Sequence, residues 1–173
     1  VCSSDLFADL LSDRQVTFIP GDAEQLSFPS GQDLIVSCSA LQWFVSPELF
    51  FKRCNALLSG HGYFAFSTFG KENLKEIAAV TGSGLHYYSL EELKKSLSMH
   101  YNIVTAGEER IRLTFATPLD VLYHLKHTGV TAVCRQAWTK GDLQEFCDKY
   151  AKLFSCGNAV TLTRSEERRV GKE

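Results

Sequence analysis

The sequence predicts an α/β fold in which a parallel sheet is joined by a crossover helix and carries a helical cap. Residues 34–38 and 61–69 are short apolar runs with the length and composition of buried strands. A helix with clear start and stop signals lies between them. The order strand, helix, strand is the one that gives a parallel pair.

Three segments are expected to be strands of this sheet. Residues 15–20 alternate in character and end at a Pro-Gly turn, which is typical of a short strand. Residues 34–38 follow a turn-like segment and have the pattern of a strand buried on both faces. Residues 61–69 are rich in aromatic side chains and bounded by glycines, which favours a central strand.

The helices are predicted from the residues at their ends. Ser46 is expected to cap the first helix, with Pro47 at its first position and Gly60 as its stop. Four further helices are predicted, one that Gly82 ends and three that begin near Ser89, Thr117 and Asp142. We expect the segments at about 71–100 and 117–156 to form the cap.

The remaining segments are predicted to be strands. Residues 101–106 and 110–115 are expected to form a hairpin around Gly107. Residues 160–163 are expected to begin a last strand.

The composition excludes several classes of function. The 173 residues include 18 Lys and Arg against 20 Asp and Glu, so there is no general basic field for nucleic acid or an anionic membrane. No apolar run is long enough to span a membrane, and no secretory signal is evident, so a cytoplasmic location is expected. The six cysteines form no CxxC pair and the five histidines lack metal-ligand spacing, so no metal site is expected.

Both ends of the chain are expected to be foreign to the fold. Residues 1–6 and 164–173 resemble translated sequencing-adapter read-through, which leaves 7–163 as the domain. The alternative is a native disordered start and a charged, solvated tail. If the ends are artefacts, the protein continues in both directions.

The candidate site lies just after the strands, because ligands of parallel sheets bind beyond the carboxyl ends. Residues 22–23, 37–43 and 68–69 are therefore expected to meet at one crevice. Asp22 could accept a hydrogen bond from an adenine amino group while the adjacent Ala23 N–H donates to the ring. The alternative is that Asp22 is only a turn residue. Small side chains and carbonyls that could face a ligand ammonium follow the next strand, at Ser37, Cys38 and Ser39, although strand ends favour small residues in any case.

The sequence motifs that characterise several common reactions are absent. The sequence contains no GxGxxG, P-loop, HExxH or GxSxG motif. Hydride transfer, nucleotide hydrolysis, zinc-protease and serine-hydrolase chemistry therefore have no support.

Taken together, residues 21–28, 32–43 and 57–69 resemble the second half of a class I S-adenosylmethionine-dependent methyltransferase. Residues 41–43 (LQW) and 119–132 (LDVLYHLKHTGVTA) are similar to the malonyl-[acyl-carrier protein] O-methyltransferase family, and the likeness runs from about residue 16 to 163. The resemblance implies a truncated Rossmann-like sheet with a helical cap insertion. The family's Gly-rich turn, ribose-binding acidic residue and N-terminal tyrosine have no counterpart in the chain, which is therefore expected to bind the cofactor poorly.

The resemblance also implies roles for individual residues. Asp22 and Ala23 would hold the adenine of S-adenosylmethionine, and the Ser37–Ser39 segment would lie near its methionyl part. Gln42 and Trp43 would line the methyl-transfer cavity. The free carboxylate of a malonyl thioester would be anchored by cap residues, for which the candidates are His86, Tyr87, Lys126 and Arg135.

The family's acidic acyl carrier protein would be steered by a basic patch whose candidates are Lys94, Lys95, Lys126, Arg135 and Lys140. Lys126 could instead be a solvated helix end, and His86 an ordinary loop residue. Two other functions stay open: a different small-molecule methyltransferase, such as a quinone-ring C-methyltransferase, or a non-catalytic binding module. The oligomeric state is not indicated.

Overall fold

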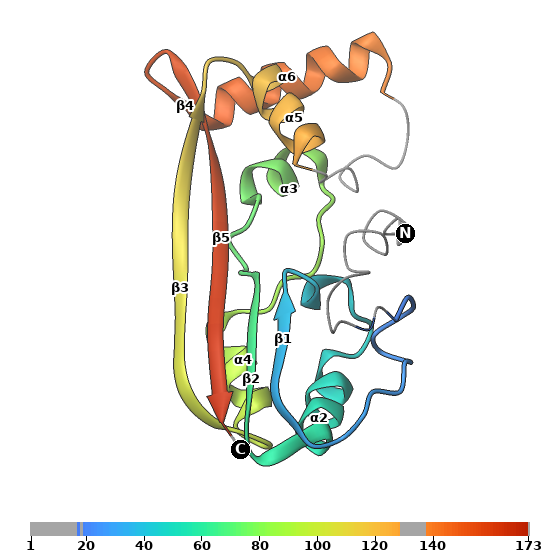
Figure 1. The fold of residues 1–173 in the computed structure, drawn as a ribbon. Helices are drawn as coiled ribbons and strands as arrows, with labels where there is room; N and C mark the ends of the chain where they lie inside the picture. The colour runs from blue at the N-terminus through green and yellow to red at the C-terminus, as the bar shows by residue number, and fades with distance from the viewer. Residues whose placement is uncertain (1–16, 18, 129–137, 173) are drawn as a thin grey trace.

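The computed structural model describes residue 17, residues 19–128 and residues 138–172, with side chains up to residue 165. Figure 1 shows a long sheet with α2 and α4 beside its lower part and α3, α5 and α6 gathered at its upper end. Half of the first predicted strand, residues 15, 16 and 18, lies outside the described residues, and residues 17, 19 and 20 are not in a strand.

The sheet is mixed, with the strand order β1-β2-β5-β3. The strands β1 (Gln32–Cys38) and β2 (Leu58–Phe69) are parallel, as predicted, and α2 (Pro47–Leu57) crosses between them. β5 (Ala159–Lys172) runs antiparallel to both β2 and β3 (Asn102–Phe115), and the short β4 (Ser155–Cys156) pairs with its start.

The prediction that residues 34–38 are buried on both faces is wrong. Leu34 and Val36 are 58% and 57% exposed. β1 pairs only with β2 in the described part of the chain, so it is an edge strand there, and its apolar composition is not matched by burial.

The predicted hairpin around Gly107 is also wrong, because β3 runs without a turn through that residue. β5 pairs with β3 from Phe115 to Asn102, so one continuous partner satisfies the backbone that a hairpin would have paired with itself. The strand predicted to begin at Val160 extends to Lys172 and so includes residues 164–172 of the tail that the sequence analysis set aside.

Most of the predicted end signals locate the helices, but Gly60 does not end the first one. α2 stops at Leu57, because the chain enters β2 at Leu58 and Gly60 belongs to that strand. Ser89 and Thr117 form capping boxes with Glu92 and Asp120, and Gly82 ends its helix with a φ of +66°. The last helix begins earlier than Asp142, since that residue is the third position of a box that Thr139 caps. The elements besides α2 are the 3₁₀ turn η1 (Leu41–Trp43), α3 (Lys75–Thr81), α4 (Leu90–Leu97), α5 (Pro118–His127) and α6 (Lys140–Phe154).

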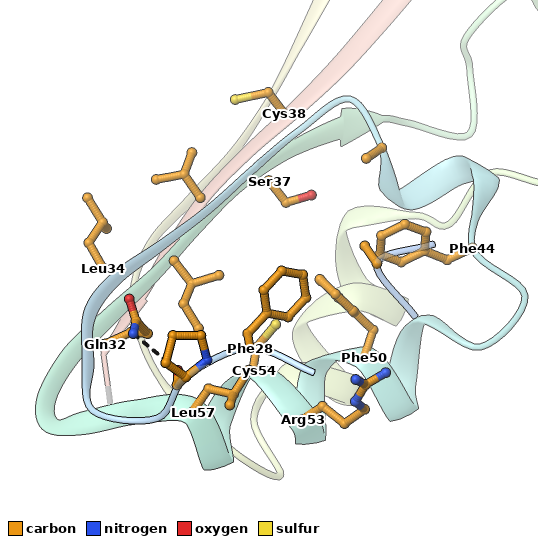
Figure 2. Close-up of a pocket in the computed structure, with 15 residues that line it drawn as sticks. Phe28, Gln32, Leu34, Ser37, Cys38, Phe44, Phe50, Arg53, Cys54 and Leu57 are labelled. Atoms are coloured by element: carbon orange, nitrogen blue, oxygen red, sulfur yellow. Dashed lines mark hydrogen bonds between the residues drawn. The ribbon is translucent and has the colours of Figure 1, made fainter. Parts of the chain in front are cut away.

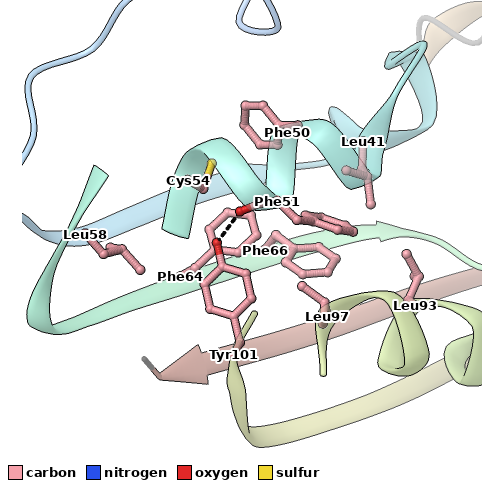
Figure 3. Packing of buried hydrophobic residues seen from close by; sticks show 10 residues of the cluster. All are labelled: Leu41, Phe50, Phe51, Cys54, Leu58, Phe64, Phe66, Leu93, Leu97 and Tyr101. Carbon is pink, nitrogen blue, oxygen red and sulfur yellow. Dashed lines mark hydrogen bonds between the residues drawn. The ribbon is translucent and has the colours of Figure 1, made fainter. Parts of the chain in front are cut away.

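Among the described side chains, two separate buried clusters hold these elements together. In the first, Phe64 and Phe66 of β2 pack against Phe51 of α2 and against Leu93 and Leu97 of α4 (Figure 3). α4 therefore packs with the sheet and α2, and not with the rest of the segment that we expected to form the cap.

The second cluster joins α3, α5, α6 and the start of β5, and its members are Ile77, Val121, Leu125, Phe146, Tyr150, Val160 and Leu162. These three helices form the structural cap at the upper end of the sheet (Figure 1). A cap at this position lies beside the carboxyl ends of β1 and β2, where the candidate site was expected.

Candidate functional site

The carboxyl ends of β1 and β2 lie side by side. Cys38 is in register with Ser67, and the Ser39 N–H donates to the Ser67 carbonyl at 2.9 Å. Ser39 has a φ of +50°, in the left-handed region that non-glycine residues seldom adopt, so the chain turns sharply where β1 ends. The expectation that these two strand ends meet is confirmed.

Gln42 joins the two strand ends through its side chain. Its Nε2 donates to the Ser39 carbonyl at 2.5 Å, and its Oε1 accepts from the Thr68 hydroxyl at 3.3 Å. Thr68, which the sequence analysis placed at the end of its strand beside the site, is only 3% exposed. Trp43 is 57% exposed, so its side chain does not form the wall of an enclosed cavity among the described residues.

Asp22 closes a turn with its own neighbours. Its Oδ1 accepts from the Glu24 N–H at 2.9 Å and its Oδ2 from the Gln25 side chain at 3.0 Å. Its carbonyl accepts from the N–H groups of Gln25 and Leu26. These contacts support the turn role of Asp22, while the carboxylate keeps acceptor capacity because it has about four lone-pair sites.

Glu24 and Arg53 attach this turn to α2. The Glu24 carboxylate accepts from the N–H groups of Val45 and Ser46 at 2.9 and 2.8 Å, directly before α2, whereas the Ser46 side chain does not make the capping hydrogen bond predicted for it. Arg53 donates to the carbonyls of Glu24 and Leu26. Sequence reasoning missed both side chains, because their partners lie more than twenty residues away and no local pattern announces them.

A cavity of about 440 Å³ lies between this turn, β1 and α2 (Figure 2). Of the predicted cofactor residues, Ala23, Ser37 and Cys38 line it, whereas Asp22 and Ser39 do not. Gln42 and Trp43, which were predicted to line the methyl-transfer cavity, do not line this one. The walls are mostly apolar, from side chains such as Phe28, Phe44 and Leu57, and Arg53 lies at one side.

The lining of the cavity fits one part of the implied cofactor. A mostly apolar space beside Ala23 suits an adenine ring. No carboxylate is among the described lining residues, so nothing there balances the cofactor's ammonium or sulfonium charge. The residues present therefore fit the adenine end alone.

Two thiols lie at this cavity. Cys38 is exposed, whereas Cys54 is buried and its desolvation raises the pKa to about 12. Cys54 therefore stays protonated near neutral pH and cannot act as a thiolate nucleophile.

The predicted substrate anchors are not brought together. Tyr87 is half-buried beside the end of β2, with its ring centroid 6.3 Å from that of Phe69 and its side chain hydrogen-bonded to Asn73, and burial raises its pKa. His86 is exposed, as is Lys126 in the last turn of α5, and Arg135 lies outside the described residues.

The basic side chains predicted to steer an acidic partner do not form one patch. Lys94 and Lys95 lie on α4, well below α5 and α6 in Figure 1, and Lys94 is ion-paired with Glu91 at 2.9 Å. Lys126 and Lys140 lie on the cap helices. The prediction of a single patch is therefore wrong for Lys94 and Lys95, because α4 packs against the sheet.

Across residues with a described placement, no helix is both long and apolar enough to cross a membrane. Within the same ranges, no three His, Cys, Asp or Glu side chains are grouped so that they could hold a metal ion.

Comparison with known sequences gives two kinds of match. Residues 3–66 match a family described as a methyltransferase domain. The malonyl-[acyl-carrier protein] O-methyltransferase of Bacteroides thetaiotaomicron is 54% identical over 165 residues, which cover 90% of this chain and 63% of that protein. The protein of the same name from Porphyromonas gingivalis is 46% identical over 151 residues, covering 86% and 59%. The chain thus spans less than two thirds of the length of these relatives.

Solved structures share the arrangement of sheet and helices. A putative methyltransferase from Bacillus halodurans superposes with a TM-score of 0.64 at 15% identity, over 96% of this chain and 75% of that one. The YcgJ protein of Bacillus subtilis does so with a TM-score of 0.60, also at 15% identity, over 98% and 76%. At such low identity the likeness concerns the fold alone.

Proposed function

We propose that this protein methylates the free carboxylate of a malonyl thioester on acyl carrier protein. The proposal follows from the class I methyltransferase fold of the chain and from its resemblance to the malonyl-[acyl-carrier protein] O-methyltransferases. The methyl donor is S-adenosylmethionine, and the reaction is an early step of biotin synthesis. The observation that carries the proposal is the identity of more than half of the aligned residues with a protein of that name.

The adenine of the cofactor is assigned to the cavity beside β1. Ala23, Ser37 and Cys38 line that cavity, and the neighbouring Asp22 carboxylate has lone pairs left for an exocyclic amino group. The Ser37–Ser39 segment is assigned to the methionyl side. The ribose and the ammonium group are left to residues upstream of the matched part, where the family carries its Gly-rich turn.

The reaction needs alignment more than proton transfer. A malonyl carboxylate is already ionised near neutral pH, so no general base is required. The bound cofactor supplies the methyl group, and the positive charge of its sulfonium disappears as the new ester bond forms. Holding the carboxylate in line in a dry cavity therefore accounts for most of the catalysis.

The anchor of that carboxylate is assigned to the cap. Tyr87 is the candidate that contacts the end of β2, and its hydroxyl can donate a hydrogen bond because burial favours its protonated form. Lys126 and His86 are exposed and could meet the thioester from the cap side. Lys126 and Lys140 on α5 and α6 are the charges that would attract an acidic carrier protein, in the cytoplasm.

Mass spectrometry tests this function. The protein used is the extended protein, defined as this chain joined to the upstream and downstream residues of its native reading frame. It is incubated with S-adenosylmethionine and malonyl-loaded acyl carrier protein, and a succinyl-loaded carrier serves as the control. We expect the mass of one methyl group to be added to the malonyl carrier alone.

The other outcomes separate the alternatives. If the extended protein binds S-adenosylhomocysteine but leaves the malonyl carrier unmodified, the substrate is wrong and a quinone-ring C-methyltransferase becomes the better assignment. If it binds no cofactor at all, the methyltransferase proposal fails and a binding module remains.

A further inference from the structure

We infer that Arg53 and Glu24 are positioning residues for adenine recognition, because together they fix the Asp22–Ala23 turn on helix α2. The inference rests on the proposed function, since it concerns the cofactor that the cavity beside β1 would hold. The resemblance described above assigns no function to Arg53 or Glu24, and neither side chain is expected to take part in the reaction itself.

The turn is fastened to α2 at two points by contacts of opposite kind. Arg53 projects from the middle of α2 and donates to two main-chain carbonyls of the turn, those of Glu24 and Leu26. The Glu24 carboxylate projects the other way and accepts from the N–H groups of Val45 and Ser46, directly before α2 begins.

These contacts suit the two side chains chemically. A planar guanidinium presents several N–H groups in a fixed fork, so Arg53 can reach two carbonyls at once, which a lysine ammonium does less well. The carboxylate of Glu24 lies at the N-terminal end of α2, where the helix dipole favours negative charge, and accepts from the two N–H groups that directly precede the helix. Each contact therefore restricts both the position and the direction of the turn.

Among the described residues, the turn has few other hydrogen bonds to the rest of the fold, although Ala23 also packs against the first buried cluster. Asp22 is exposed, and its carboxylate contacts are made within the turn itself. Ala23 lines the cavity, and none of the hydrogen bonds resolved in the described ranges uses its N–H. In the described part of the chain, the side-chain hydrogen bonds that fix the Ala23 N–H and the Asp22 carboxylate relative to α2 are therefore those of Arg53 and Glu24.

A ligand pair separates positioning from general stability. S-adenosylhomocysteine carries an adenine amino group that Asp22 could bind, whereas S-inosylhomocysteine carries a carbonyl at that position and presents an acceptor to the carboxylate. The ratio of the two dissociation constants measures how strongly the turn favours adenine over hypoxanthine. A variant that only loosens the fold weakens both ligands alike and leaves the ratio unchanged.

The test measures both dissociation constants by calorimetry in the extended protein and in its variants Arg53→Gln, Arg53→Lys and Glu24→Gln. Lys52→Gln is the matched control, since it removes one positive charge from an exposed position of the same helix. Circular dichroism and thermal unfolding check that each variant is folded. Glu24→Gln keeps the shape of its side chain and one amide oxygen as acceptor, so it serves if the Arg53 variants fail to fold.

We expect Arg53→Gln to bind S-adenosylhomocysteine about 10- to 100-fold more weakly, the loss that a displacement of about 1 Å can produce. The preference for adenine over hypoxanthine should fall in Arg53→Gln and Glu24→Gln, with Arg53→Lys intermediate, and the KM for the malonyl carrier should stay within about twofold of the parent.

An unchanged ligand ratio in the folded Arg53 and Glu24 variants, equal to that of Lys52→Gln, would overturn the positioning role. That result differs from the failure of the proposed function, in which the unmodified extended protein itself binds neither ligand.

Discussion

Both carboxylate oxygens of Glu76 accept hydrogen bonds from Thr163, one from its backbone N–H at 2.9 Å and one from its hydroxyl at 2.6 Å. The two residues are buried, with Glu76 only 2% exposed. This pair connects α3 to β5, and so connects the cap to the sheet at a position where water cannot replace a lost partner.

The first prediction concerns this pair. Glu76→Leu leaves two buried donors of Thr163 unsatisfied, so we expect the free energy of unfolding to fall by about 2–4 kcal/mol. Urea denaturation measures it. Glu72→Gln is the control, because Glu72 forms only an exposed ion pair with Lys75 and should cost well under about 1 kcal/mol. Equal losses in both variants would mean that the buried Glu76–Thr163 pair stabilises the fold no more than the exposed ion pair does.

The second prediction concerns the bridge between the two strand ends. Thr68→Val removes the hydroxyl that donates to Gln42, so the amide loses one of its two fixed contacts. We expect a loss of about 1 kcal/mol in unfolding free energy and weaker binding of S-adenosylhomocysteine, with both restored in Thr68→Ser. A Thr68→Ser variant as impaired as Thr68→Val would show that the methyl group matters and the hydroxyl does not.

The third prediction concerns the two thiols at the cavity. At pH 8 iodoacetamide should modify the exposed Cys38 and leave Cys54 untouched, because burial raises the Cys54 pKa to about 12 and also blocks access. Peptide mass spectrometry with and without urea measures both sites. Bound S-adenosylhomocysteine should slow labelling of Cys38. Rapid labelling of Cys54 in the folded protein would contradict this packing of α2.

The fourth prediction concerns the pH dependence of stability. The N–H and hydroxyl of Thr139 donate to Asp142, which holds the pKa of that carboxyl below its usual value. A carboxyl with a lowered pKa in the folded state contributes stability that is present above its unfolded pKa of about 3.9 and is lost as the pH falls through the folded value. Asp142→Asn should therefore flatten the fall in unfolding free energy below about pH 4. Asp148→Asn, an exposed change on the same helix, is the comparison, and identical curves for the two variants would rule the effect out.

The fifth prediction concerns the substrate anchor. Lys126→Ala should raise the KM for the malonyl carrier severalfold and leave the affinity for S-adenosylhomocysteine unchanged, since Lys126 lies on α5 and does not line the cavity beside β1. Lys152→Ala on α6 provides a control of equal charge. Unaltered kinetics in Lys126→Ala would remove this residue from the candidates and leave Tyr87 as the better one.

Local signals in the sequence predicted the helices well. The capping boxes at Ser89 and Thr117 are completed within three residues, so their chemistry is visible in a short window. The parallel β1 and β2 pair followed from its crossover helix in the same way. The continuity of β3 was not predictable, because it depends on a partner strand that lies more than forty residues later in the chain.

The candidate site was predicted only in part, because some of its contacts join residues that lie far apart in the chain. Topology indicated that strand ends meet, and Ala23, Ser37 and Cys38 do line one cavity. The attachment of the turn by Glu24 and Arg53 depends on contacts across 21 to 29 residues, which no spacing rule anticipates. Arginine and glutamate side chains usually lie exposed on the protein surface, so the residue types of Arg53 and Glu24 did not indicate these contacts either.

The two buried clusters have no side chain in common, and this divides the molecule into regions that can open separately. Amide protons of α5 and α6 are protected by one set of contacts, and those of α2 and α4 by the other. Hydrogen exchange should therefore report two opening free energies instead of one. An opening confined to α3, α5 and α6 leaves Phe64 and Phe66 covered, so the substrate proposed above would have room to enter beside the strand ends while the sheet stays folded.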